Sequence, residues 1–502
     1  MGSLQTEGSQ RREAKSKARE SGYDGVQMRR FAIAVPCLAL AGLLAAAAAG
    51  PALRAEGSPP MADVRFITLD PGHFHAALVQ KEMYPGVSNV VHVYAPLGPD
   101  LIDHLARVSR FNQRAENPTR WELQVHATPD FLAQMLKDRA GNAVVLSGRN
   151  RGKIDRVQAS LDAGLNALVD KPWILETGDL PKLERALDTA EASKLVALDI
   201  MTERHEVTSE LQRELVNDPA TFGTLVAGTE ADPGVYMESV HHLMKVVAGA
   251  PNIRPTWFFD TDEQGEGLND IGTHLVDLVH WTLFPEQALD YHKDVRVLSA
   301  QRWPTMIPRD QFKRVTGQDI PAALSAKVKD GALEYFCNTL VSYTARGTHV
   351  KLNVIWDWEP PAGGGDSHFA YYRGTRAKVE IRQGTAEKYR PELYVVPNTP
   401  ADKAAVLAAI QKKMAAVQTA HPGVAVEDRG AELRVSIPDR LRIGHEDHFA
   451  QVTQRFLRYV RDRSTLPAWE RPNMLAKYYV TTEGTALARK SPPRVAERIA
   501  PK

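Results

Sequence analysis

The sequence predicts an α/β fold, with a Rossmann-like parallel sheet followed by an α+β domain that has an open, mostly antiparallel sheet. Between Val64 and Ile200, short apolar runs alternate with amphipathic stretches, which is the strand-helix-strand pattern of a parallel sheet. From about Phe222 onward, several runs alternate polar and apolar residues, as in a sheet with one covered face. The predicted segments are a targeting segment with a tail (1–60), the Rossmann-like domain (61–202) and the α+β domain (203–502).

The composition is that of a globular protein. The chain has 502 residues, 43% hydrophobic and 25% charged, which is enough apolar material for two domains. A net charge of +1 gives no electrostatic reason to expect nucleic acid or an anionic membrane as a partner. Only two cysteines occur, Cys37 and Cys337, so the sequence predicts neither a disulfide framework nor a cysteine metal site.

The N-terminus has the features of an export signal. After a polar start, the basic stretch Met28–Phe31 opens an apolar run from Ala32 to Ala49, and small residues follow up to Ala55. This order is typical of a secretory signal peptide, and Met28 is an alternative start of the chain. The Arg29-Arg30 pair favours twin-arginine export. We therefore expect a periplasmic or secreted protein with no stable membrane span after processing, the alternative being a permanent anchor.

In the first domain, apolar runs predict strands and runs with helical spacing predict helices. The predicted strands are Val64–Leu69, Val90–Tyr94, Asn142–Leu146, Leu165–Val169 and Leu195–Ile200. The predicted helices run from the turn at Asp70 to about Met83, from Ile154 to Ala163 and from Leu180 to Ser193. A further helix, Val207–Val216, follows the crossover into the second domain.

The second domain is predicted to be rich in strands. They are Gly223–Thr229, Trp257–Phe259, Val295–Leu298, Leu340–Tyr343, Val350–Trp356, Ala377–Ile381 and Leu393–Val396. An inserted helix and a hairpin are predicted at Asp402–Thr419 and Val424–Pro438, and closing helices at Glu446–Arg461 and Asn473–Leu487.

One predicted helix, near the middle of the chain, carries groups suited to proton transfer. A glycine-rich turn begins at Gly265, and the residues after it have an apolar stripe at helical spacing. Asp270 and His274 lie one turn apart on a second face, so the carboxylate can orient the imidazole and tune a group that titrates near neutral pH. The alternative is an Asp that caps the helix and a buried His with structural partners only.

A second motif ends a predicted strand with a charge. Leu165–Val169 is followed by Asp170, Lys171 and Pro172, and the proline favours an extended conformation at Lys171. The ammonium would then lie at the carboxyl end of the strand, where open α/β sheets bind their ligands. The alternative is a solvated surface lysine.

Together, the Asp170-Lys171-Pro172 motif and the "GEGLNDIGTHLVD" stretch resemble the glucose-fructose oxidoreductase/inositol dehydrogenase (Gfo/Idh/MocA) family over roughly Val64 to Pro285. The resemblance implies hydride transfer between a sugar, polyol or glycoside and NAD or NADP, and the expected export favours a tightly bound cofactor. It also implies a homo-oligomer. In this interpretation His274 moves the hydroxyl proton, Asp270 orients it, and Lys171 stabilises charge on the substrate oxygen.

The expected cofactor contacts lie at the first strand-helix turn and after the strand at 142–146. They are Gly72, His73, Phe74, Ser147, Asn150 and Lys171. The turn departs from the family pattern, since Asp70 and His75 stand where the first and third glycines of G-x-G-x-x-G are expected. The second strand ends at Tyr94 without the acidic residue that binds the adenosine ribose. NAD, NADP or unusual binding, and the absence of any dinucleotide, all remain open.

Residues near the crossover and on the central helix are the expected substrate contacts. They are Glu203, His205 and Asp277. Clusters that mix aromatic and polar groups, at 302–305, 356–359 and 363–368, have the side chains that a sugar site needs, although core packing explains them equally well.

Three alternatives to a dehydrogenase remain. One is a cofactor-free carbohydrate-binding or scaffold protein, and another is a redox-neutral NAD-dependent glycosidase. The third is a metal hydrolase or isomerase, because histidines are paired at His73/His75, His241/His242 and His445/His448. The sequence places no third ligand beside any pair, so we predict no metal site.

Overall fold

The structure is a computed structural model, and it describes residues 63–247 and 250–493, which lie within one compact unit. The predicted signal peptide and Cys37 lie outside these residues. Within the described ranges, no helix combines the length and the apolar character needed to cross a membrane.

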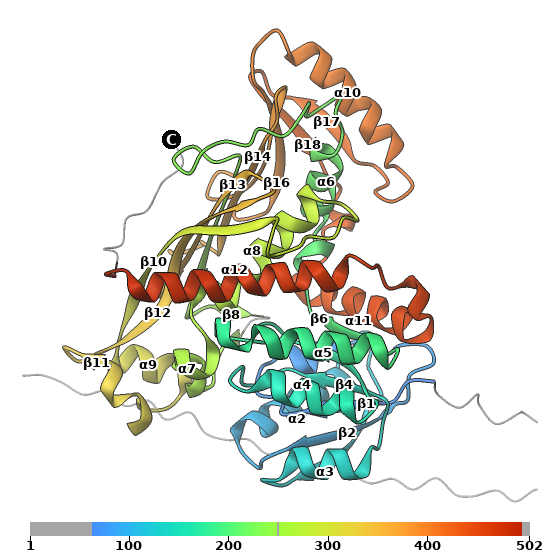
Figure 1. Cartoon of the computed structure of the whole chain (residues 1–502), viewed down its shortest axis with the longest axis vertical. Coiled ribbons are helices and arrows are strands. Elements are labelled where there is room, and N and C mark those ends of the chain that lie inside the picture. Colours follow the sequence, from blue (N-terminus) through green and yellow to red (C-terminus); the bar gives the residue numbers. More distant parts are fainter. Residues whose placement is uncertain (1–62, 248–249, 494–502) are drawn as a thin grey trace, which may run out of the picture. The chain divides into compact units, whose positions relative to one another are not determined.

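The first sheet has six parallel strands in the order β3-β2-β1-β4-β5-β6 (Figure 1). The strands are β1 (Phe66–Leu69), β2 (Val90–Ala95), β3 (Glu122–Ala127), β4 (Ala143–Leu146), β5 (Asn166–Val169) and β6 (Ala197–Asp199). This doubly wound order reverses beside β1, and ligands of such sheets bind at that point, beyond the carboxyl ends of the strands. The predicted Rossmann-like sheet is thereby confirmed.

Helices cover the sheet, so β1 and β4 are buried throughout, and all their residues are apolar except Thr68. The helices are α1 (His75–Val79), α2 (Pro99–Gln113), α3 (Phe131–Asp138), α4 (Lys153–Asp162) and α5 (Leu180–Ala192). The first of them ends at Val79 rather than near Met83, so that the helix after the first turn is shorter than predicted.

The second sheet has ten strands, and all neighbours are antiparallel except the parallel pair β7 and β13. They are β7 (Val235–His242), β10 (Val295–Pro308), β11 (Val328–Lys329), β12 (Ala332–Ala345), β13 (Thr348–Asp357), β14 (Ser367–Arg373), β15 (Ala377–Gln383), β16 (Glu392–Pro397), β17 (Ala425–Asp428) and β18 (Leu433–Ser436). A separate short pair joins β8 (Val246–Val247) and β9 (Ala250–Pro251). The predicted open, mostly antiparallel sheet is confirmed.

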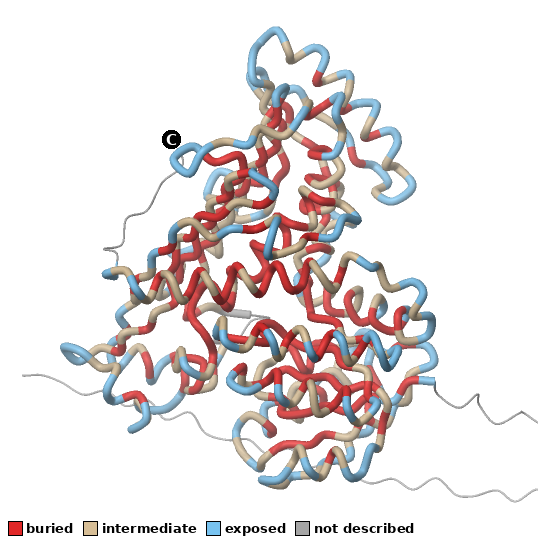
Figure 2. The backbone as a smooth tube through the Cα atoms, viewed as in Figure 1, coloured by how far each residue is buried: buried red, intermediate tan, exposed pale blue. Residues whose placement is uncertain are grey.

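Helices accompany this sheet at several points. They are α6 (Val207–Val216), α7 (Thr261–Gln264), α8 (Gly267–Leu283), α9 (Arg309–Thr316) and α10 (Lys403–Ala416). Figure 2 shows that burial is concentrated along the central strands, whereas α10 is largely exposed. The predicted insertion is confirmed as α10 followed by the β17–β18 hairpin.

Two predicted strands are wrong. Thr256–Phe259 forms a 3-10 helix, and the three consecutive residues Trp257, Phe258 and Phe259 are all buried, which strand alternation does not produce. The segment 223–229 forms only isolated bridges, from Leu225 to Gly374 and from Gly228 to Pro233. The aromatic and small β-forming residues of these segments favour strands locally. Tertiary packing nevertheless determines the structure that they adopt.

The last two helices return to the first sheet. They are α11 (His445–Arg461) and α12 (Glu470–Lys490). Phe449 and Phe456 of α11 enter the core on one face of the parallel sheet, and Met474 and Tyr478 of α12 enter the core on the other. Figure 1 shows α12 crossing between the two sheets, where it contacts α5, α8 and β10. The C-terminal residues therefore complete the core of the N-terminal sheet.

Candidate functional site

A cavity of about 490 Å³ lies at the carboxyl end of the parallel sheet, against the second sheet. The turn after β1 contributes His73 to its wall, the end of β5 contributes Lys171, and α8 contributes Asp270 and His274. Strands of the second sheet close the other side, with residues such as Trp356. The motifs that the sequence singled out therefore meet in one space.

Lys171 and Asp270 are in direct contact. The ammonium of Lys171 donates to the Asp270 carboxylate and also lies 3.3 Å from the Asp270 backbone oxygen. Both residues are buried. Burial by itself raises the pKa of a carboxyl group, but the charge and hydrogen bond of Lys171 outweigh it and hold the pKa of Asp270 below its usual value.

The position of Asp270 follows from how α8 begins. Glu266, not Asp270, caps the helix, and its side chain and that of Asn269 form a capping box. Gly265 before the cap has φ +93°, a conformation that favours glycine. Val276 and Val279 anchor the opposite face in the core, so Asp270 and His274 face the cavity.

His274 lines the cavity without bonding Asp270. Its Nδ1 is buried and has no hydrogen-bond partner among the described residues, and the Asp270 carboxylate is occupied by Lys171. The predicted orientation of His274 by Asp270 is therefore absent from this geometry. Burial, and then the nearby charge of Lys171, lower the pKa of His274 to about 4, so the ring is neutral at physiological pH and can accept a proton.

Of the three predicted substrate residues, one lines the cavity and two do not. Glu203 lines the cavity, where His445 Nδ1 lies 3.1 Å from its Oε1. His205 is absent from the lining, and its Nε2 is buried without a partner. Asp277 is also absent from the lining, because it lies about two turns further along α8 than Asp270, in a buried ion network.

That network joins the two sheets through five buried charged side chains. They are Asp199, Arg204, Asp277, Glu470 and Lys477. Arg204 donates to Asp277 at 2.6 and 2.7 Å and to Glu470 at 2.8 Å. Lys477 lies 2.5 Å from Asp199 and 2.9 Å from Asp277. Asp277 therefore fixes α8 against the crossover and α12 rather than contacting a ligand.

The turn after β1 is closed by contacts of its own. The N–H of Gly72 donates to the backbone oxygen of Asp70, and the N–H of His73 donates to that of Ser147, each at 2.9 Å. A Cβ on Gly72 would lie 3.1 Å from Asp100 Oδ2 and 3.2 Å from a ring carbon of Trp257. The face of Gly72 is thus covered by a carboxylate and an indole.

The other predicted cofactor contacts have protein partners. Ser147 is fully buried and its hydroxyl donates to Asp170 at 2.9 Å. Asn150 is buried and donates to both oxygens of Gln264, which belongs to α7 of the second domain. Phe74 lines the cavity beside His73.

Two groups of histidines contact carboxylates at this cavity. His73 and His75 both face Asp170, a residue that sequence reasoning used only to place a motif. On the second sheet, Asp366 contacts His241 at 3.2 Å and His242 at 3.0 Å. The paired histidines were visible in the sequence, but each acidic partner lies about a hundred residues or more away.

One protein family matches most of the second domain. The family model described as "Putative oxidoreductase C terminal domain" matches residues 211–489. No curated protein matches the chain.

Solved structures match both domains together. A "putative oxidoreductase" from Parabacteroides merdae has 44% identity and a TM-score of 0.83, over 86% of this chain and 98% of that one. A second "putative oxidoreductase", from Erwinia carotovora atroseptica, has 16% identity and a TM-score of 0.53, over 86% and 100%. GenD2 of gentamicin A biosynthesis, solved with NAD, has 16% identity and a TM-score of 0.52, over 86% and 95%. The last two matches concern the fold alone.

Proposed function

The chain belongs to the family described as "Putative oxidoreductase C terminal domain", and we propose from this membership that it is an oxidoreductase acting on a sugar, polyol or glycoside. Its two motifs support placing it in the Gfo/Idh/MocA group. The doubly wound strand order of the parallel sheet, together with the similarity in fold to GenD2, which was solved with NAD, supports NAD or NADP as the redox partner.

One observation carries the proposal. Lys171 follows β5 of the parallel sheet, whereas Asp270 and His274 lie on α8. All three side chains line one cavity. A cation, a carboxylate and a neutral imidazole around one space are the groups needed to move a proton on and off a substrate hydroxyl.

Each group has a defined task in this proposal. His274 is neutral at physiological pH and accepts the hydroxyl proton of the substrate. The ammonium of Lys171 stabilises negative charge on the same oxygen. Asp270 accepts from that ammonium and holds it at the cavity wall.

The rest of the wall suits a hydroxylated ligand. The indole of Trp356 offers a ring face, and Ser239, His241 and Gln383 offer hydrogen-bonding groups. The volume of about 490 Å³ is in the range of small-molecule sites. These features support a sugar or polyol rather than a purely apolar substrate.

The turn after β1 does not fit the diphosphate of a dinucleotide in the usual way. Two of its N–H groups are bonded to backbone oxygens, and Asp100 and Trp257 cover Gly72. Asp70 and Asp100 also place two carboxylates at this turn, and these already pair with the nearby cations of Arg156 and Arg149. NAD or NADP would have to bind without the usual contacts to the N–H groups of this turn. The roles proposed for His274, Lys171 and Asp270 therefore concern only the substrate oxygen.

The direct test is the cofactor content of the native protein. The chain is purified without added nucleotide, denatured, and the released small molecules are identified by mass spectrometry. NAD or NADP in a fixed ratio to protein supports the proposal. An empty protein that also fails to bind either nucleotide in calorimetry favours the cofactor-free carbohydrate-binding alternative.

Export is a further proposal, supported by the signal-like N-terminus. Free nicotinamide nucleotides are scarce outside the cytoplasm, so an exported enzyme would keep its cofactor bound and return it to its starting state in each cycle. This favours either oxidation of one sugar with reduction of another, or a redox-neutral glycosidase. Cell fractionation tests the location.

A further inference from the structure

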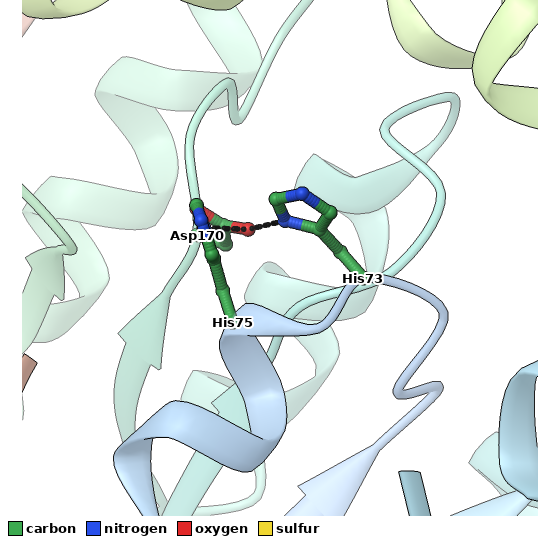
Figure 3. A group of neighbouring side chains, drawn as sticks. All are labelled: His73, His75 and Asp170. Atoms are coloured by element: carbon green, nitrogen blue, oxygen red, sulfur yellow. Dashed lines mark hydrogen bonds and ion pairs between the residues drawn. The ribbon is translucent and has the colours of Figure 1, made fainter. Parts of the chain in front are cut away.

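Three side chains converge at the edge of the cavity (Figure 3). His73 lies on the turn that leads into α1, His75 is the first residue of α1, and Asp170 directly follows β5. His73 Nδ1 is 2.8 Å from Asp170 Oδ2, and His75 Nδ1 is 3.1 Å from the same oxygen. One ligand atom from each residue lies within 4.8 Å of the others.

We propose that His73, His75 and Asp170 bind one divalent transition-metal ion of the zinc class. Two imidazoles and a carboxylate form a ligand set used by catalytic zinc and by other first-row metals. Bonds of about 2.0–2.2 Å around one ion place neighbouring ligand atoms roughly 3–3.5 Å apart. The separations of 2.8 and 3.1 Å need only small side-chain shifts to reach this arrangement.

Neighbouring side chains hold Asp170 and His75 in positions suited to binding an ion. The hydroxyl of Ser147 donates to Asp170 Oδ2 at 2.9 Å, and Lys153 donates to the Asp170 backbone oxygen at 3.0 Å. The ring of His75 packs against Phe449 of α11, with the two centroids 4.6 Å apart. Such outer contacts orient ligands around a metal ion.

Direct contact between the carboxylate and an ammonium distinguishes the other group of histidines from this cluster. Asp366, which contacts His241 and His242, also contacts the ammonium of Lys245 at 2.7 Å, and that cation opposes a metal ion. Beside Asp170, the ammonium of Lys171 contacts Asp270 instead. Lys153 contacts the backbone oxygen and the side chain of Asn150, not the Asp170 carboxylate.

The ion would border the cavity, because His73 and His75 are part of its wall. The three protein ligands leave a position that a water molecule or a substrate oxygen can fill. An ion there would polarise that oxygen beside Lys171. His73 and His75, which occur where a glycine-rich turn was expected, would thus serve as metal ligands.

The test measures metal directly and does not depend on catalysis. The full chain is purified natively and its metals are counted by plasma mass spectrometry. It is then stripped with a chelator and titrated with Zn²⁺ and with Co²⁺, whose visible absorption reports the ligands. We expect one ion per chain, and binding about tenfold weaker in Ser147→Ala, which keeps all three ligands.

Variants separate this site from others. His73→Gln and His75→Gln should abolish the Co²⁺ spectrum, whereas Asp366→Asn should leave it intact. His73 is partly exposed, so we expect His73→Gln to fold. Its Co²⁺ binding can therefore be measured even if His75→Gln fails to fold. A stripped protein that binds neither ion, which would leave the three groups as hydrogen-bonded partners, overturns the proposal. The proposal is also overturned if both histidine variants keep the Co²⁺ spectrum and Asp366→Asn loses it. Cofactor release tests the proposed oxidoreductase independently.

Discussion

The ammonium of Lys171 donates to the carboxylate of Asp270, although 99 residues separate them in the sequence. The pair is buried at the junction of β5 and α8, at the wall of the cavity. Each charge compensates the other in a buried place, so removing either partner alone would leave an uncompensated buried charge.

Lys171→Met should remove most turnover. The variant loses the cation that stabilises charge on the substrate oxygen and leaves Asp270 without its partner. We expect a decrease of about 10²- to 10⁴-fold in kcat, measured with whichever sugar or polyol the native protein converts.

A double variant separates catalysis from folding. Lys171→Met with Asp270→Asn removes both charges, so it should regain thermal stability relative to Lys171→Met alone but remain inactive. Native turnover in Lys171→Met would contradict the proposed role. Lys182→Met, which breaks an exposed ion pair on α5, serves as the control.

The pH dependence of turnover should report His274. Burial and Lys171 lower the pKa of this ring to about 4, so its neutral form predominates above that pH and is lost as the pH falls through it. The value of kcat/KM should therefore decrease below about pH 4 in the native protein. His274→Gln should lose this acidic limb together with most activity, whereas exposed His292→Gln should keep both. A limb that persists in a still active His274→Gln variant would assign it to another group.

Much of the fold was predictable because its signals are local. The strands of the parallel sheet are short apolar runs between amphipathic helices, so β1, β4 and β5 begin and end near the predicted residues. The predicted strand at Trp257–Phe259 is wrong because its side chains are all buried around one helical turn. Nothing in a local pattern distinguishes these two kinds of burial.

The site was predictable only where a motif named its residues. Lys171, Asp270 and His274 were found from two motifs, and all three line the cavity. The position of Asp277 in an ion network was not predictable, because Arg204 precedes it by 73 residues and Lys477 follows it by 200. The same limit hid Asp170 as the partner of two histidines.

Lys477→Met should destabilise the protein strongly. The variant leaves Asp199 and Asp277 buried with less compensating charge, and removing one partner of a buried network costs about 3–5 kcal/mol. The measurement is the free energy of unfolding in denaturant. Lys293→Met, which removes a surface pair with Asp290, should leave the unfolding midpoint unchanged. Equal midpoints in the two variants would refute the structural role of the network.

Glu206→Gln should stabilise the protein at high pH. Burial, and then the charge of Glu203, raise the pKa of Glu206 from 4.5 to about 7. The folded state therefore holds the proton more tightly than the unfolded state, and folding is increasingly opposed as the pH rises from about 4.5 to about 7.

The expected gain in Tm for Glu206→Gln is negligible at pH 5 and reaches roughly 1 °C at pH 8, corresponding to about 1 kcal/mol. Glutamine keeps an oxygen that can accept from Thr208 at the start of α6. Exposed Glu116→Gln controls for the loss of one negative charge. A gain that does not grow with pH would show that burial of this carboxylate does not oppose folding.

Gly267→Ala tests how closely α8 must approach the second sheet. A Cβ at this position would lie 1.9 Å from the backbone oxygen of Cys337 in β12, so the start of the helix would have to move away from the strand. Overpacking of this kind costs about 1–3 kcal/mol. Since Asp270 lies one turn further along, its contact with Lys171 should weaken too, and turnover should decrease together with Tm. Gly178→Ala is the matched control, because a Cβ there meets no atom within 4 Å. A Gly267→Ala variant as stable and active as Gly178→Ala would mean that the position of α8 does not set the geometry of the pair.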